Sequence, residues 1–138
     1  MTKELVIFSD GGSRGNPGPA AGAYVIKDPH GLVVEESGVF LGVTTNNVAE
    51  YRALLAGLEK AVKLRPQKVD CFLDSELVVK QLNGQYRIKD EKMRQLFGEI
   101  SKITKYFKNV SFNHVPLSQN KRADELVNRT LDAQPKAC

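Results

Sequence analysis

Cysteine, histidine and tryptophan are scarce in this sequence, which narrows the chemistry it can perform. The 138 residues include no tryptophan, two histidines and two cysteines, Cys71 and Cys138. No C-x-x-C spacing occurs, so no cysteine-based metal site is indicated. Cys71 lies in an apolar run and Cys138 is the last residue. This placement favours a buried thiol and a terminal thiol over a disulfide, although the sequence leaves a link between them open.

Long apolar runs are also missing. No stretch approaches the roughly 20 apolar residues that a membrane span requires. The N-terminal MTKELVIFSD has too short an apolar run for a signal peptide and no cleavage site. We therefore expect a cytoplasmic protein without a membrane partner. Because neither repeats nor linkers interrupt the chain, we predict one domain over residues 1–138, a monomer, with a tail from about residue 133.

The spacing of apolar residues predicts an α/β fold. A continuous apolar run over residues 5–8 is typical of a strand buried on both faces, whereas Tyr51, Leu54 and Leu58 recur on one helical stripe. The sequence DPHG at residues 28–31 indicates a turn between two strands. A mixed sheet with helices packed on it follows. Strands are predicted over residues 4–10, 22–28, 32–42, 68–74 and 109–115, and helices over 46–64, 75–84, 89–107 and 120–133, the last capped by Asn120.

The glycine-rich stretch FSDGGSRGNPGP, residues 8–19, first suggests a phosphate-binding loop. Its spacing lacks the G-x-x-x-x-G-K-[ST] pattern of a Walker loop. A dinucleotide-binding G-x-G-x-x-G opens a helix, whereas this stretch leads into a strand. A tight connection between two strands explains the glycines and prolines. It leaves unexplained why the apolar strand ends in Asp10.

Four carboxylates share an unusual placement. Asp10 and Asp74 end two predicted apolar strands, and Glu50 and Asp124 lie early in two predicted helices, on their apolar faces. Each of the last three also has a simpler explanation. Asp74 fits a helix N-cap, and Glu50 fits an N-x-x-E capping box with Asn47. Asp124 fits the positive end of a helix dipole.

If the four acids meet beyond the carboxyl ends of the central strands, they repel one another. Two carboxylates about 5 Å apart cost roughly 3 kcal/mol at an effective dielectric near 20, and a whole domain is stable by only about 5–15 kcal/mol. Divalent cations relieve such repulsion, and oxygen-only ligands indicate Mg²⁺ or Mn²⁺ rather than zinc. The histidines are expected to be a turn residue, His30, and a structural residue, His114, rather than ligands.

A pair of divalent ions and a basic surface together suggest a nucleic acid substrate. Two magnesium ions about 3.5–4 Å apart form a general device for phosphodiester hydrolysis. The net charge is +4, and setting the four acids aside leaves 20 basic against 12 acidic residues. The remaining surface is therefore suited to a nucleic acid backbone.

Four segments, taken together, resemble the signature segments of type 1 ribonuclease H. They are, in chain order, FSDGGSRGNPGPAAGAYVI, TTNNVAEYRALLAGLE, FLDSELVVKQLNG and HVPLSQNKRADELVN. With their matching spacings, the resemblance extends over nearly the whole chain, from residue 8 to residue 128. The resemblance implies a ribonuclease H-like fold, whose five-stranded mixed sheet has three antiparallel strands followed by two parallel additions and is flanked by helices.

The resemblance also implies an activity and its residues. It implies an endonuclease that hydrolyses the RNA strand of an RNA–DNA hybrid with Mg²⁺ or Mn²⁺, two ions with substrate bound, and leaves 3′-hydroxyl and 5′-phosphate ends. The implied catalytic and metal-binding residues are Asp10, Glu50, Asp74 and Asp124. Glycine permits close backbone approach, and an amide side chain can pair with the 2′-hydroxyl of RNA. The implied substrate contacts are Gly11, Gly12, Asn16, Thr45, Asn46 and Asn47, although helix capping also explains Asn46 and Asn47.

Two features of some family members are missing. Many relatives have a histidine in the loop before the last helix, where this chain has VPLSQNK, residues 115–121. Some relatives insert a basic, tryptophan-containing protrusion, where this chain has only the short NGQYRIKDEKMRQ, residues 83–95. Arg87 and Lys89 are candidates to replace part of that protrusion, and solvated surface charge explains each of them as well.

Three other functions are compatible with the pattern. They are a hybrid- or RNA-binding module without catalysis, a nuclease of the same fold that cleaves double-stranded RNA, and a small metabolite-binding α/β protein. The presence of all four acids argues against the first, and the lack of a phosphate-binding fingerprint argues against the last. Competition among RNA–DNA, RNA–RNA and DNA–DNA duplexes distinguishes the second.

Overall fold

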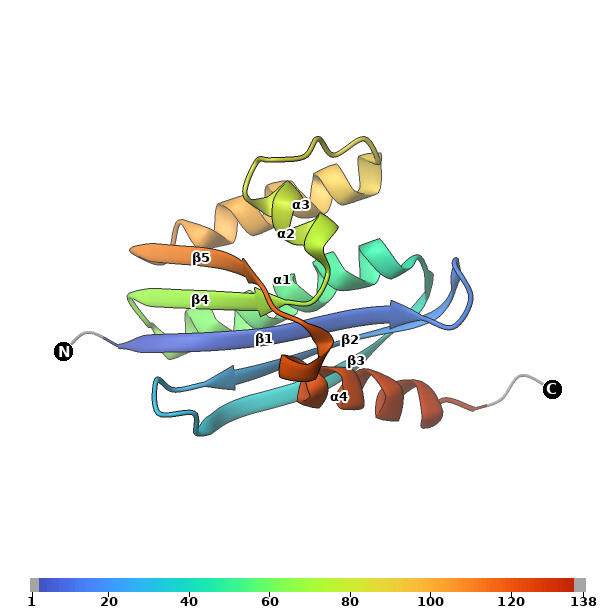
Figure 1. The fold of residues 1–138 in the computed structure, drawn as a ribbon, viewed down its shortest axis with the longest axis horizontal. Helices are drawn as coiled ribbons and strands as arrows, with labels where there is room; N and C mark the ends of the chain where they lie inside the picture. Colours follow the sequence, from blue (N-terminus) through green and yellow to red (C-terminus); the bar gives the residue numbers. More distant parts are fainter. Residues whose placement is uncertain (1–2, 136–138) are drawn as a thin grey trace.

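The computed structural model describes residues 3–135 and contains one five-stranded mixed sheet with helices on both faces (Figure 1). The strands are β1 (Glu4–Ser13), β2 (Gly18–Lys27), β3 (Val33–Thr44), β4 (Lys68–Leu73) and β5 (Asn109–His114). The helices are α1 (Asn46–Leu64), α2 (Glu76–Leu82), α3 (Glu91–Thr104) and α4 (Lys121–Asp132), and a short 3₁₀ turn, Leu117–Gln119, precedes α4.

The strand order places β1 at the centre of the sheet. The order is β3-β2-β1-β4-β5, in which β1, β2 and β3 form an antiparallel meander. β4 pairs parallel to β1, and β5 pairs parallel to β4. The predicted three antiparallel strands with two parallel additions are confirmed. Because β1 and β4 are parallel neighbours, their carboxyl ends lie at the same edge of the sheet, where sites form in such folds.

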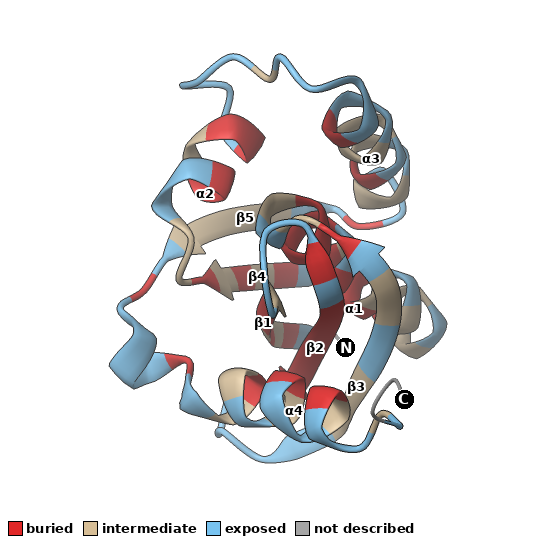
Figure 2. Ribbon diagram, turned by 90° about the vertical axis from the view of Figure 1, so that its right-hand side faces the viewer, coloured by how far each residue is buried: buried red, intermediate tan, exposed pale blue. Residues whose placement is uncertain are grey.

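The larger hydrophobic core lies between the sheet and α1, α2 and α3 (Figure 2). α1 contributes the predicted stripe, since Tyr51, Leu54 and Leu58 are fully buried. α1 lies very close to β1 at Gly11, where a Cβ atom would overlap the helix backbone at Glu50. A glycine is therefore needed here for helix packing, and the close approach brings Glu50 directly over β1.

α4 covers the opposite face of the sheet over β2 and β3 (Figure 1). A smaller apolar cluster holds it there, formed by Ala21 and Ala23 of β2 with Val127 and Leu131 of α4. At Gly38 of β3, a Cβ atom would overlap a side chain of α4. Small residues on the sheet thus allow α4 to pack closely against β2 and β3. This packing places the first turn of α4 near the carboxyl ends of β1 and β4.

The first hairpin is longer than predicted. β1 continues past Asp10 to Ser13, and β2 begins at Gly18. The two strands pair from Val6 opposite Lys27 to Ser13 opposite Ala20. The prediction that the strand ends at Asp10 is therefore wrong, because glycine and serine continue the backbone ladder without an alternating apolar pattern.

The second turn and α1 agree with the prediction. The Asp28 carboxylate accepts hydrogen bonds from the backbone amides of His30, at 2.8 Å, and Leu32, at 3.0 Å. Gly31 has a φ of 88°, a value that glycine adopts readily. α1 has the predicted bounds, residues 46–64.

Several expectations from composition are only partly tested. Between residues 3 and 135, no helix combines the length and apolar character needed to cross a membrane. Cys71 is buried as predicted, but the second half of the predicted tail, residues 136–138 with Cys138, lies outside the described residues. The single domain and the monomeric state stay predictions.

Candidate metal centre

Three carboxylates from three different elements meet at the carboxyl end of the sheet. Asp10 lies in β1, Asp74 directly follows β4, and Glu50 lies near the start of α1. One oxygen of each carboxylate lies within 4.8 Å of the others. Ser9 and Leu73 are paired in the parallel strands β1 and β4, so the next residue of each strand reaches the same edge. The fold thus forms the cluster from residues 64 positions apart in sequence.

Burial makes this cluster electrostatically costly. The exposed fraction is 7% for Asp10 and 5% for Glu50. Burial, followed by the charge of Asp74, raises the pKa of Asp10 from 3.8 to about 7. Burial and the neighbouring Asp10 raise the pKa of Glu50 well above its usual value. The pocket therefore favours a proton or a cation over three bare negative charges.

The donor set fits hard divalent cations. Glu50 Oε2 is buried and has no hydrogen-bond partner within the described chain. Over residues 3–135, no lysine or arginine forms an ion pair with Asp10, Glu50, Asp74 or Asp124. An all-carboxylate site with an unpartnered buried oxygen, and without an ion-paired lysine or arginine among the described residues, suits Mg²⁺ or Mn²⁺.

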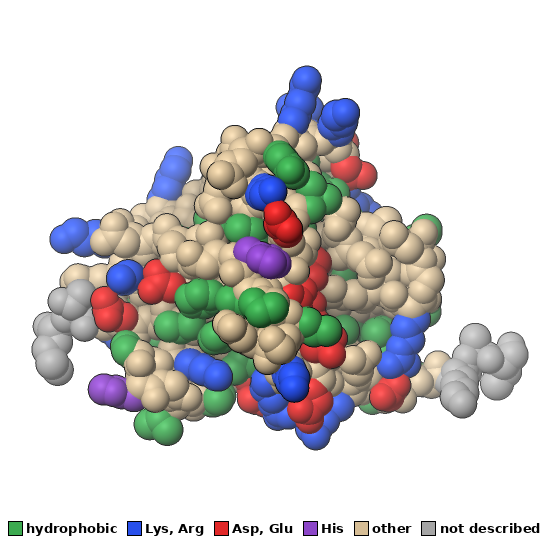
Figure 3. All heavy atoms as spheres, in the orientation of Figure 1, with side chains coloured by type: hydrophobic (Ala, Val, Ile, Leu, Met, Phe, Trp, Pro, Cys, Tyr) green, Lys and Arg blue, Asp and Glu red, His purple; other side chains and the backbone are tan. Residues whose placement is uncertain are grey.

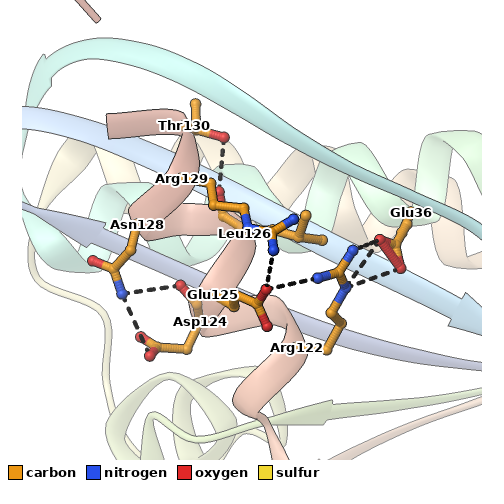
Figure 4. A network of polar contacts seen from close by, with 8 residues as sticks. All are labelled: Glu36, Arg122, Asp124, Glu125, Leu126, Asn128, Arg129 and Thr130. Atoms are coloured by element: carbon orange, nitrogen blue, oxygen red, sulfur yellow. Dashed lines mark hydrogen bonds and ion pairs between the residues drawn. The ribbon is translucent and has the colours of Figure 1, made fainter. Parts of the chain in front are cut away.

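Asp124 lies at the rim of the cluster. It is half-buried in the first turn of α4 and is not among the three carboxylates within 4.8 Å of one another. Its charge contributes to the raised pKa of Asp10, after the larger effects of burial and of Asp74. Asn128 Nδ2 donates to the Asp124 backbone carbonyl at 3.1 Å and to its carboxylate at 3.5 Å (Figure 4). All four predicted acids therefore border one site, at two different depths.

The simpler roles considered for Asp74 and Glu50 are wrong. Ser75 rather than Asp74 caps α2, since the Ser75 hydroxyl accepts from the Val78 amide at 3.3 Å. At α1, the Thr45 hydroxyl accepts from the Val48 amide at 3.2 Å and replaces the capping box expected for Glu50. Neither carboxylate is needed to start its helix.

An open cleft of about 330 Å³ extends from the cluster along the start of α1. Of the predicted substrate contacts, Gly11, Gly12, Asn46 and Asn47 line it, whereas Asn16 and Thr45 do not. Residues of the cleft that the sequence did not single out include Ser13, Arg14, Ser75, Leu117 and Asn128. Ser13 ends β1, Arg14 and Ser75 lie between elements, Leu117 begins the 3₁₀ turn, and Asn128 is a polar residue within α4, so no apolar periodicity identifies them.

The tip of the first hairpin is tied to the start of α1. The Asn46 side-chain oxygen, Oδ1, accepts from the Ser13 amide at 2.7 Å and from the Ser13 hydroxyl at 3.1 Å. The Asn16 side chain accepts from the Asn46 backbone amide at 3.1 Å. Asn16 and Thr45 thus support the backbone that borders the cleft, and their direct contact with a substrate stays a prediction.

An ion-pair network fixes α4 to the edge of the sheet (Figure 4). Arg122 of α4 donates from Nε and a terminal nitrogen to the Glu36 carboxylate of β3. Glu125 accepts from Arg122 at 3.0 Å and pairs with Arg129 at 2.6 Å. These contacts begin two residues before Asp124 and hold the first turns of α4 in register with the sheet.

Charged side chains are mixed on the face that contains the carboxyl end of β1 (Figure 3). Lysine and arginine side chains are scattered there, and acidic and hydrophobic side chains separate them. On this face, the positive charge expected to hold a nucleic acid backbone is distributed in small groups.

Comparison with known proteins identifies the family. Residues 8–130 match the family described as reverse transcriptase-like. The chain is 42% identical over 125 residues to ribonuclease HI of Halobacterium salinarum, covering 91% of this chain and 63% of that protein. It is 32% identical over 133 residues to a ribonuclease H of Campylobacter concisus, covering 90% of each.

Solved structures of similar proteins share the fold. The N-terminal RNase H domain of Rv2228c from Mycobacterium tuberculosis has a TM-score of 0.92 and 40% identity, with 96% of each chain covered. LC11-RNase H1, solved in complex with an RNA/DNA hybrid, has a TM-score of 0.88 and 43% identity, with 93% of this chain and 96% of that chain covered. The complete mycobacterial protein, named as bifunctional, is longer, and the match spans only 36% of its length.

Proposed function

This chain belongs to the ribonuclease H family, and from that membership we propose that it is an endonuclease that hydrolyses the RNA strand of RNA–DNA hybrids. The observation that carries the proposal is the convergence of Asp10, Glu50 and Asp74 in one cleft, where no lysine or arginine of residues 3–135 forms an ion pair with them. The hybrid bound to LC11-RNase H1 supports the choice of substrate.

The proposed cofactors are two Mg²⁺ or Mn²⁺ ions held by the four acids when substrate is bound. When bound, such ions supply an activated water and stabilise the departing 3′-oxygen, which leaves 3′-hydroxyl and 5′-phosphate ends. Asp10 and Glu50 provide buried ligands, and Asp74 provides a half-buried one. Asp124, which Asn128 contacts at the open rim, provides the fourth carboxylate from the wall of the cleft.

The cleft beside the acids suits the minor groove of a hybrid. Asn46 uses its side-chain oxygen for Ser13, so its Nδ2 hydrogens are left to donate to a 2′-hydroxyl or a base edge. A Cβ at Gly12 would meet no atom closer than 3.9 Å, so its backbone borders open space. Asn47 is proposed as a second amide contact. Gly11, Asn16 and Thr45 remain in the proposal as residues that shape this border.

The test is cleavage of a hybrid labelled uniformly in its RNA strand. We expect internal cleavage with Mg²⁺ or Mn²⁺, none with chelator, and none from Asp10→Asn under the same conditions. A folded wild-type protein that leaves the hybrid intact with both metals contradicts the proposal. Unlabelled RNA–RNA and DNA–DNA duplexes added as competitors show whether the enzyme acts on hybrids alone.

A further inference from the structure

Asn120 is a buried amide whose side chain contacts one of the clustered acids, Asp74. It lies between the 3₁₀ turn and α4, and its exposed fraction is only 2%. The sequence predicts a helix cap at this position. Its side chain makes no capping hydrogen bond with the described first turn of α4, so another role must explain why an amide is buried here.

The amide group bridges the ends of two parallel strands. Asn120 Nδ2 donates to the backbone carbonyl of Ser9 at 2.8 Å and to Asp74 Oδ2 at 3.1 Å. An amide nitrogen has two hydrogens, and both partners are acceptors, so the orientation of the group is fixed. The donor side faces the strand ends, and Ser9 directly precedes Asp10.

The backbone of Asn120 contacts the fourth acid. Its carbonyl accepts from the Asp124 amide at 3.1 Å. One residue therefore links the strand that contains Asp10, the carboxylate of Asp74 and the helix turn that contains Asp124. The Asn120 side-chain oxygen is buried without a partner in the described chain, a cost that makes sense only if the donor group is what the position requires.

We propose that Asn120 is a positioning residue for the metal ligands, an inference that rests on the proposed function. By donating to Asp74 Oδ2, it holds the rotamer of that carboxylate, and the other oxygen keeps its lone pairs for a cation. By bonding to Ser9, it fixes the start of α4 against β1. Hydrogen bonds of this kind orient ligating carboxylates, and their loss weakens metal binding and activity.

Substitution by aspartate separates positioning from capping. Aspartate has the shape of asparagine and caps helices equally well, so a capping role predicts that Asn120→Asp keeps its activity. A positioning role predicts the reverse, because an acceptor then faces Asp74 where a donor is needed. Asn113 offers a matched control. Its half-buried amide donates to the Cys71 carbonyl at 3.2 Å and the Ser111 hydroxyl at 2.9 Å, and neither acceptor belongs to the four acids.

The experiment measures hybrid cleavage and Mn²⁺ binding for wild type, Asn120→Ala, Asn120→Asp and Asn113→Ala. For both Asn120 variants we expect kcat to fall roughly 10- to 100-fold while KM for the hybrid stays within about twofold. Calorimetric titration with Mn²⁺ alone should show about tenfold weaker binding. Asn113→Ala should match wild type in both measurements.

The other possible results distinguish a failure of the role inferred for Asn120 from a failure of the proposed nuclease function. Folded Asn120 variants that match Asn113→Ala in kcat and Mn²⁺ affinity overturn the positioning role. An Asn120→Asp enzyme as active as wild type, or failure of both variants to fold, assigns Asn120 a purely structural role. If wild type binds Mn²⁺ and cleaves no hybrid, the proposed function fails, and the Mn²⁺ affinities still decide the role of Asn120.

Discussion

Two groups of acidic side chains in this protein lie in opposite electrostatic environments, one that lowers the pKa and one that raises it. On the β3–α4 side, Glu36 is paired with Arg122, and its hydrogen bonds with that arginine lower its pKa. Beside the carboxyl end of β4, Asp10 and Glu50 are buried with other acids, and the pKa of each is raised, first by burial. Glu36 thus has an arginine partner within the fold, whereas Asp10 and Glu50 have no basic partner among the described residues.

The difference indicates what each group is for. The Glu36–Arg122 pair joins a helix to a strand with charges that the chain itself provides. The cluster of Asp10, Glu50 and Asp74 is left incomplete by the described residues and needs charge from outside. Repulsion of this kind is a cost to stability, and a function that requires bound cations explains why the fold maintains it.

The largest expected effect comes from neutralising the centre of the cluster. Asp10→Asn should lower hybrid cleavage at least about a thousandfold, or about 4 kcal/mol in the barrier, because it removes a ligand shared by the cluster. Its melting temperature in chelator should equal or exceed that of wild type, since repulsion is relieved. Glu36→Gln, measured in the same cleavage assay, should stay close to wild type. Equal losses in the two variants would remove the distinction between the two groups.

Neutralising Asp124, at the rim, should reduce cleavage less than neutralising Asp10 or Glu50, which are buried. Asp124→Asn should reduce kcat by roughly 10- to 100-fold, because Asp124 is half-buried and lies outside the closest group. Single-turnover cleavage with saturating Mn²⁺ checks this order. A loss as great as that of Asp10→Asn would show that depth in the cleft does not rank the ligands.

The two groups should respond to pH with opposite signs. The pKa of Asp10 is about 7 in the folded protein and 3.8 ordinarily, so between these values the folded state binds more protons than the unfolded state. Its contribution to stability is therefore complete below pH 3.8 and is lost as the pH rises to about 7. Glu36, with a lowered pKa, contributes stability that is lost as the pH falls.

The effect of Asp10 on stability is measured by denaturant unfolding in chelator, as the difference in unfolding free energy between wild type and Asp10→Asn. From pH 4 to pH 7, wild type should lose stability relative to Asp10→Asn, and saturating Mn²⁺ should abolish that relative loss at pH 7. A constant difference between the two proteins across this range would mean that burial does not raise the Asp10 pKa as described.

The smallest effect is expected at the ion pair. The Arg122 and Glu36 side chains are 40% and 25% exposed, and solvent weakens such a pair. Glu36→Gln should therefore lower the melting temperature by only a few degrees, and the decrease should shrink in high salt. A large decrease in melting temperature that does not depend on salt would show that the Glu36–Arg122 pair, rather than the apolar cluster beneath α4, holds the helix on the sheet.

Much of the fold follows from local pattern in the sequence. α1 has its predicted bounds because an apolar stripe over four turns coincides with a residue that can cap at Thr45. β1 is longer than predicted because Gly11 and Gly12 carry no side-chain signal, although their backbones pair with β2. The sequence suggests that Gly11 serves the substrate, whereas the structure shows that α1 needs the space first.

The site depends more on tertiary structure. The four acids can be nominated from the sequence because acids at strand ends and on apolar helix faces are unusual. Their relative positions cannot be predicted in this way, because the separation of Asp124 from Asp10, Glu50 and Asp74 depends on how α4 packs on the sheet. The role inferred for Asn120 is likewise hidden, since its hydrogen bond to Ser9 spans 111 positions and its place before a helix already suggests a cap.

The most direct test of whether outside cations complete the acidic cluster is a titration of the metal-free protein with Mn²⁺ at pH 8, followed by calorimetry and by melting temperature. Wild type should bind the ion and melt at a higher temperature as binding saturates, whereas Asp10→Asn should show much weaker binding and little change in melting. A wild-type protein that neither binds Mn²⁺ nor gains stability from it, and so behaves as Asp10→Asn does, would contradict a cluster built for metal.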